Sequence, residues 1–150
     1  MKPQAVEEGV LEFERARRAI AMDNTVAGLA GIEKALSCND DMRWYSYLGY
    51  CVAKERGQVS RGTELCMISL EQEPGNPEHY VNLGKILLLS GKKAEALRTL
   101  RDGMAQGGST ELIALLTQFG NRKSPVIPIL PRTSPLNKIL GLLLHRIGLR

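Results

Sequence analysis

Residues with chemically useful side chains are present, but none of them forms a known catalytic or metal-binding pattern. The two histidines, His79 and His145, lie on distant segments, and neither belongs to H-E-x-x-H or to another His/Cys metal spacing. The sequence also contains no P-loop, G-x-G-x-x-G or G-x-S-x-G signature. The adjacent acids Asp40 and Asp41 are better explained as a helix-capping turn before Met42 than as a metal site. We therefore expect that the protein is not an enzyme and has no metal site and no cofactor.

The composition favours a helical domain. Alanine, leucine, glutamate, arginine and lysine are abundant, while aromatic residues make up only 5% of the chain. Straight-chain residues lose little rotamer freedom in a helix, and 150 residues are enough to bury a core.

The sequence indicates a soluble protein of the cytoplasm. The first residues lack the apolar stretch of a signal peptide, and no window approaches the roughly 18–20 apolar residues of a membrane span. The three cysteines, Cys38, Cys51 and Cys66, are odd in number and show no C-x-x-C spacing. A disulfide framework is therefore not expected, and a reducing compartment is the natural interpretation.

The positive charge is concentrated at one end of the chain. Residues 122–150 carry six basic residues and no acidic ones, whereas the net charge of the whole chain is only +4. The remainder is close to neutral, so the sequence does not predict a general nucleic-acid-binding surface.

An internal repeat organises the first two thirds of the sequence. Residues Tyr45–Val52 align with Tyr80–Leu87, and both segments follow the pattern aromatic-x-x-Leu-Gly-x-x-aliphatic. Downstream, Ala96–Leu100 and Gly62–Cys66 occupy equivalent places, with a small residue at the first position and a larger one four residues later. Pro74 lies between the two copies, where it stops a helix because it lacks an N–H group.

These residues resemble the tetratricopeptide repeat, a helical hairpin whose first helix has the signature W-x-x-L-G-x-x-Y. The resemblance implies an all-α fold in which antiparallel hairpins stack as a short right-handed solenoid. It predicts a repeat domain over residues 1–120, with units at about 5–41, 42–76 and 77–108 and a capping helix at 109–119. The first unit is degenerate, since it offers Ala16 where the others have glycine.

The resemblance also implies roles for small and buried residues. Gly49 and Gly84 are expected to let the two helices of a hairpin approach closely. Cys51 and Cys66 fall on positions that pack inward, so we expect buried thiols, while Cys38 lies at a turn and merits checking for exposure.

The function that the resemblance implies is protein binding. Arrays of this family bind a peptide or helix on the concave surface formed by the first helices, which predicts an adaptor or assembly factor. Carried over by position, the groove residues are Arg43, Ser46, Tyr47, Tyr50, Lys54, Glu78, Val81, Asn82, Lys85, Leu88 and Leu89. Some of these side chains could instead pack against a neighbouring hairpin or the tail.

One subtype of the family is not expected. Members that grip a C-terminal carboxylate use a basic clamp of lysine, asparagine and arginine. Phe13, Arg17, Tyr47, Glu78 and Asn82 occupy those places here, so the clamp is missing.

The C-terminal residues predict a linker and a final helix. Residues 121–135 contain Pro125, Pro128 and Pro131 at a spacing that favours polyproline II, and residues 136–150 form an amphipathic helix that begins after Ser134. The apolar side chains expected to contact another surface are Val126, Ile127, Ile129, Leu130, Leu136, Ile139, Leu140, Leu143, Leu144 and Ile147.

Three alternatives remain for the surface that this apolar tail contacts. It can pack on the body of the protein, where Ser124–Pro131 would fill the groove as a built-in ligand, or it can form a homodimer or dock a partner. A membrane surface is the least favoured, because the helix carries modest charge and no flanking aromatic residue. Two alternative functions follow: a small chaperone that shields a hydrophobic client, as in secretion systems, and a structural homodimer.

Overall fold

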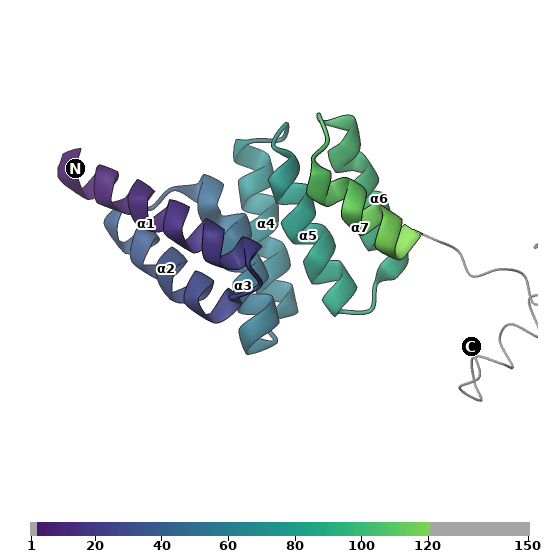
Figure 1. Cartoon of the computed structure of the whole chain (residues 1–150), viewed down its shortest axis with the longest axis horizontal. Coiled ribbons are helices and arrows are strands. Elements are labelled where there is room, and N and C mark those ends of the chain that lie inside the picture. The colour runs from purple at the N-terminus through teal and green to yellow at the C-terminus, as the bar shows by residue number, and fades with distance from the viewer. Residues whose placement is uncertain (1–2, 121–150) are drawn as a thin grey trace, which may run out of the picture. The chain divides into compact units, whose positions relative to one another are not determined.

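The computed structural model describes residues 3–120, and within this range the protein is entirely helical (Figure 1). The predicted all-α class is therefore confirmed for the described residues. The helices are α1 (Pro3–Ala21), α2 (Thr25–Cys38), the 3₁₀ helix η1 (Met42–Trp44), α3 (Tyr45–Arg56), α4 (Val59–Gln72), α5 (Pro77–Leu89), α6 (Lys93–Ala105) and α7 (Thr110–Gly120). The predicted linker, final helix and tail contacts at 121–150 lie outside the described residues.

The helices are arranged as three hairpins in chain order. Helices α1 and α2, α3 and α4, and α5 and α6 pack against each other in pairs. Neighbouring pairs also touch, since α2 contacts α3, both α3 and α4 contact α5, and α6 contacts α7 (Figure 1). The first helices of successive hairpins are thereby brought next to one another.

Side-chain caps define where several helices begin. Asn24, Asp41, Asn76 and Ser109 each precede a helix and accept a hydrogen bond from a backbone N–H in its first turn, over 3.0–3.2 Å. Such caps satisfy N–H groups that have no partner within the helix. The prediction that the Asp40–Asp41 pair forms a capping turn is confirmed.

Small residues set the distance between the helices of each hairpin. A Cβ atom on Gly49 would lie 2.5 Å from the backbone oxygen of Gly62, and the reverse holds for a Cβ on Gly62. The expected close approach at Gly49 is therefore confirmed. In the first hairpin the glycine lies on the opposite helix, where a Cβ on Gly31 would lie 2.8 Å from the Cβ of Ala16.

A continuous apolar core runs through the hairpins from Phe13 to Ala96. Cys51 and Cys66 are fully buried within it, as predicted, and Cys38 is partly buried. Burial raises the pKa of Cys51 to about 12, so its thiolate is strongly disfavoured at neutral pH. A smaller cluster of Val81, Leu100 and Leu112 joins α5, α6 and α7.

Candidate binding groove

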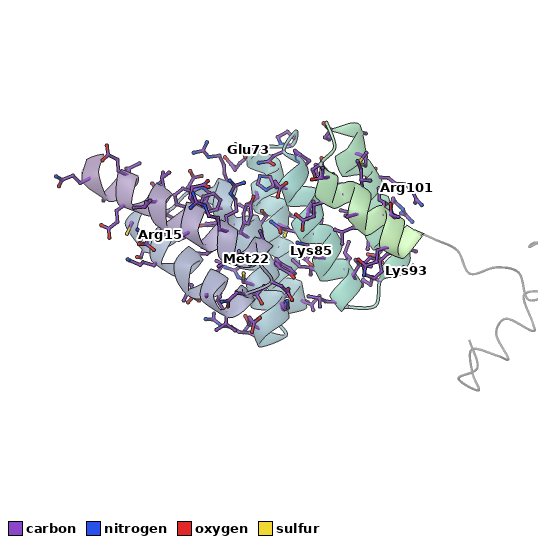
Figure 2. All side chains as sticks on the ribbon, in the orientation of Figure 1. Arg15, Met22, Glu73, Lys85, Lys93 and Arg101 are labelled. Atoms are coloured by element: carbon purple, nitrogen blue, oxygen red, sulfur yellow. The ribbon has the colours of Figure 1, made fainter. Side chains whose placement is uncertain are left out.

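Three adjoining hollows lie along α1, α3, α5 and α7, and we refer to them together as the groove. The aromatic hollow has a volume of about 470 Å³, the central hollow about 320 Å³ and the leucine hollow about 560 Å³. The first two share Arg17, Tyr47 and Glu78, and the last two share Lys85, which projects from α5 (Figure 2). Each is within the usual range of ligand sites, about 300–1,000 Å³.

The walls of the hollows differ in character. Phe13, Trp44 and Tyr47 line the aromatic hollow, where the Phe13 and Trp44 rings stack at 4.7 Å and Tyr47 meets Phe13 edge-on at 5.2 Å. The leucine hollow is lined by Asp23, Tyr50, Lys85, Leu88, Leu89, Leu115, Gln118 and Phe119. The groove therefore offers aromatic surface at one end and aliphatic surface at the other.

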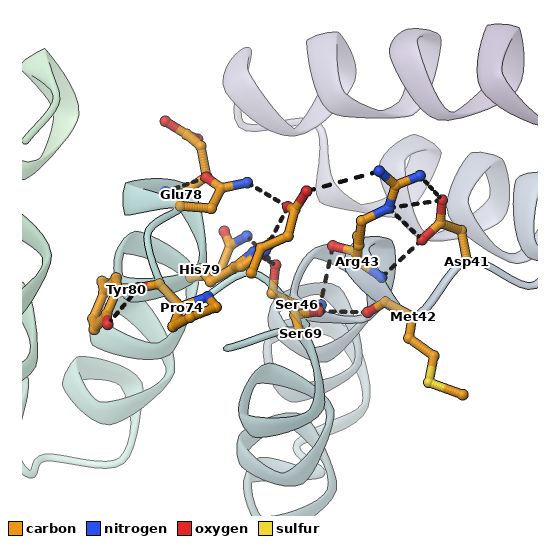
Figure 3. A network of polar contacts seen from close by, with 12 residues as sticks. Asp41, Met42, Arg43, Ser46, Ser69, Pro74, Glu78, His79 and Tyr80 are labelled. Atoms are coloured by element: carbon orange, nitrogen blue, oxygen red, sulfur yellow. Dashed lines mark hydrogen bonds and ion pairs between the residues drawn. The ribbon is translucent and has the colours of Figure 1, made fainter. Parts of the chain in front are cut away.

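A network of polar contacts includes Glu73 and His79, which also line the aromatic hollow (Figure 3). Ser46 Oγ is 2.8 Å from His79 Nδ1, and Asn82 Nδ2 donates to the same hydroxyl over 3.2 Å. Ser69 Oγ accepts the backbone N–H of Ser46 over 2.8 Å. His79 Nε2 lies 3.3 Å from a carboxylate oxygen of Glu73. The network thus joins α3, α4, α5 and the turn between α4 and α5.

One assignment of protons satisfies the whole network. Neutral His79 donates from Nε2 to Glu73 and accepts the Ser46 hydroxyl at Nδ1, which leaves the Ser46 oxygen free to accept from Asn82. Burial lowers the pKa of His79, although the hydrogen bond that Nε2 donates to Glu73 opposes this shift. The neutral imidazole is therefore the form that fits the folded protein.

The chain of Glu73, His79 and Ser46 superficially resembles the acid, base and nucleophile of a hydrolase. Its hydroxyl, however, is fully enclosed, because Ser46 has an exposed fraction of 0%. A nucleophile must reach the substrate, so in this position the three residues hold helices together. No spacing in the sequence predicts this grouping, since its members are brought together by the packing of two hairpins.

Most charged side chains around the groove are paired. Arg17 contacts Glu14 at 2.9 Å, and Lys54 contacts Asp23 at 2.5 Å. Arg43 forms a two-pronged contact with Asp41 and reaches Glu73 at 3.8 Å. Lys85 pairs with Glu111 of α7.

Glu78 is the exception among the acidic residues of the central and aromatic hollows. Within residues 3–120 its carboxylate takes part in no hydrogen bond or ion pair. Its backbone N–H donates to the side-chain oxygen of Asn76. Burial, and secondarily the nearby Glu111, raise the pKa of Glu78 above its ordinary value of 4.5. The surroundings therefore disfavour the negative charge that this side chain carries at neutral pH.

The predicted groove residues divide into two sets. Eight line at least one hollow: Arg43, Tyr47, Tyr50, Glu78, Asn82, Lys85, Leu88 and Leu89. Ser46, Lys54 and Val81 line none of the three. Ser46 belongs to the buried network and Val81 to the small apolar cluster, because both point toward a neighbouring helix.

Several groove residues come from helices that the repeat pattern did not emphasise. Val10, Glu14 and Arg18 are contributed by α1, and Glu111, Leu115, Gln118 and Phe119 by α7. The spacing of Val10, Glu14, Arg17 and Arg18 by three or four residues was the available signal, since such positions share one face of a helix.

Two further findings concern only the part of the chain that the structure describes. No group of three or more histidine, cysteine, aspartate or glutamate side chains is placed to hold a metal ion there. No helix there is long and apolar enough to cross a membrane.

Comparison with known protein families finds a match, which lies within the second and third hairpins. Residues 65–98 match the tetratricopeptide repeat, from Leu65 in α4 across the proline turn and α5 into α6. No curated protein matches the chain significantly. Repeats of this family are in general non-catalytic modules that bind other proteins. Of the segments that carry the resemblance, Pro74 and Tyr80–Leu87 lie within the matched range, whereas Tyr45–Val52 lies outside it, so residues 65–98 are the part of the chain that is similar to a tetratricopeptide repeat.

Proposed function

We propose that this protein is an adaptor or assembly factor that binds a peptide or a helix of another protein in the groove. The observation that carries the proposal is the run of three adjoining hollows along α1, α3, α5 and α7. On this proposal the three hairpins form a short right-handed solenoid, and α7 caps its last hairpin. The first helices then supply the concave, ligand-binding side.

The surface chemistry of the groove suits a peptide. Tyr47 and Tyr50 line the hollows although they are largely buried, Leu88 and Leu89 present aliphatic surface, and Asn82 can hydrogen-bond a backbone amide. Such a combination of apolar pockets with a few polar groups is typical of protein recognition sites.

A matched pair of exposed apolar residues tests the proposal. Leu89 lines the leucine hollow and is 52% exposed, whereas Met67 on α4 is 47% exposed and lines none of the hollows. Full-length chains bearing Leu89→Glu or Met67→Glu are compared with the wild type in quantitative capture of binding proteins. We expect Leu89→Glu to weaken capture of the partner about tenfold or more, and Met67→Glu to leave it unchanged. The opposite pattern would place binding outside the groove.

A small chaperone is the second candidate, favoured by the leucine hollow. Leu88, Leu115 and Phe119 are only partly buried there, and Leu89 is exposed, so the hollow can cover an apolar segment of a client. A client that binds the wild type only while unfolded would support this role over an adaptor. The alternative of a homodimer through the last helix concerns residues outside the described range, and sedimentation of a 1–134 truncation tests it. The cytoplasmic location also stays a prediction.

A further inference from the structure

We propose that the groove recognises a basic side chain, lysine or arginine, which the ligand places against Glu78 between the aromatic and central hollows. This inference rests on the proposed function and specifies the chemistry of the partner.

The pairing of charges leaves one carboxylate available. Glu14 is held by Arg17, Glu73 receives the amide of Asn76 and contacts Arg43, and Glu111 is held by Lys85. Glu78 lies in both hollows and has no side-chain partner within residues 3–120. A cationic group that enters the groove therefore finds one acid that needs no other bond to be broken first.

Because Glu78 is partly buried, the lack of a partner matters more for its carboxylate than it would at the surface. Its side chain is partly buried at the start of α5, beside a second carboxylate on Glu111. Water solvates a partly buried carboxylate poorly, and a charged donor compensates for this better than a neutral one.

The neighbouring groups suit the remainder of a basic side chain. Asn82 is only 2% exposed, and its amide nitrogen is committed to Ser46. Asn82 lines the central hollow, and within residues 3–120 its amide oxygen takes part in no hydrogen bond. Tyr47 lines the same hollow and offers aromatic surface to a cation or to its alkyl stem.

The basic residues of the groove do not reverse this preference. Lys85 and Arg17 lie close enough to Glu78 to offset part of the rise in its pKa, but both are paired with other acids, as is Arg43. Arg18 is exposed, and water can solvate an exposed guanidinium fully. Among the described residues of the groove, the unpaired charged group that is partly buried is thus the carboxylate of Glu78.

Glu78 has a second role that the test must separate from ligand binding. It lies in the first turn of α5, where a negative charge interacts favourably with the helix dipole. Glu95 lies in the first turn of α6, is exposed and lines none of the three hollows, so Glu95→Gln removes an equivalent charge away from the groove.

The experiment starts from an unbiased ligand source. A random dodecapeptide display library is selected on the full-length chain, and only peptides that lose binding to Leu89→Glu are kept as groove ligands. Trp44 is the single tryptophan of the chain and lines the aromatic hollow, so its fluorescence reports binding during titration. Each selected peptide is titrated with its basic residues intact and with each one replaced by glutamine.

The expected result is an excess of lysine and arginine among groove ligands. One basic position should matter most, and its replacement should weaken binding about tenfold in the wild type and in Glu95→Gln. In Glu78→Gln the same replacement should have an effect of less than about twofold. Selected peptides without an excess of basic residues, or an equal loss in Glu78→Gln, would overturn the inference and leave the proposed function standing. A selection that yields no groove-dependent peptide would overturn both.

Discussion

The Oγ atom of Ser46 on α3 lies 2.8 Å from Nδ1 of His79 on α5, and this contact joins two successive hairpins at a fully buried point. Asn82 donates to the same hydroxyl, so Ser46 is bonded to two side chains of α5. A network of this kind fixes how one hairpin sits on the next, because each partner has few other bonds available in the core.

Removing the Ser46 hydroxyl should therefore destabilise the fold. Ser46→Ala leaves the Nδ1 acceptor of His79 and the amide of Asn82 without their partner, which we expect to lower the free energy of unfolding by about 2 kcal/mol. Urea denaturation followed by circular dichroism measures the change. Ser60→Ala, at an exposed position of α4, is the control and should shift stability by less than about 0.5 kcal/mol.

The buried imidazole should make stability depend on pH. The pKa of His79 is lowered from its ordinary value of 6.5, so the unfolded chain binds the proton more tightly than the folded one. Stability is then complete above about pH 6.5 and falls as the pH drops from there toward the pKa of the folded state. Urea midpoints measured at pH 7.5 and 5.5 should differ more for the wild type than for His79→Gln. An equal difference in both proteins would show that His79 does not cause the dependence.

Glu78 should show the opposite dependence. Because its pKa is raised from 4.5, the folded protein holds the proton more tightly, and that contribution to stability is lost as the pH rises through the folded value. Glu78→Gln imitates the protonated form, so its stability relative to the wild type should rise between pH 4 and pH 7, by about 0.5 kcal/mol. A relative stability that falls over this interval would mean that the helix dipole dominates at this position.

The contact between Gly49 and Gly62 should tolerate no side chain. Gly49→Ala places a Cβ 2.5 Å from a backbone oxygen, so α3 and α4 must separate, and we expect a loss of about 2 kcal/mol despite the better helix propensity of alanine. Gly75→Ala is the matched control, since nothing lies within 4 Å of its new Cβ. Thermal unfolding of the two variants should separate them clearly.

The three thiols should differ in reactivity. Cys51 and Cys66 are fully enclosed, and burial raises the pKa of both, whereas Cys38 is partly accessible. Alkylation at pH 8 should modify Cys38 alone in the folded protein and all three thiols in urea. Mass spectrometry of the labelled peptides identifies the sites, and early labelling of Cys51 would indicate that the second hairpin opens readily.

The amino-acid sequence by itself determined the features that depend on short-range geometry. The spacing around Gly49, the capping acid Asp41 and the inward positions of Cys51 and Cys66 all follow from neighbours within one hairpin or one turn. Such features are encoded locally, because a helix places residues three or four apart on one face and a cap acts over a single turn.

Only the tertiary structure decided which side chains line the three hollows. Ser46 and Val81 follow the positional pattern of the family but line none of the hollows, while Glu111 and Phe119 line them from α7, outside the matched repeat. The isolation of Glu78 likewise depends on where Arg17 and Lys85 find their partners. These outcomes are set by the angles and distances between hairpins far apart in the chain, which no local spacing specifies.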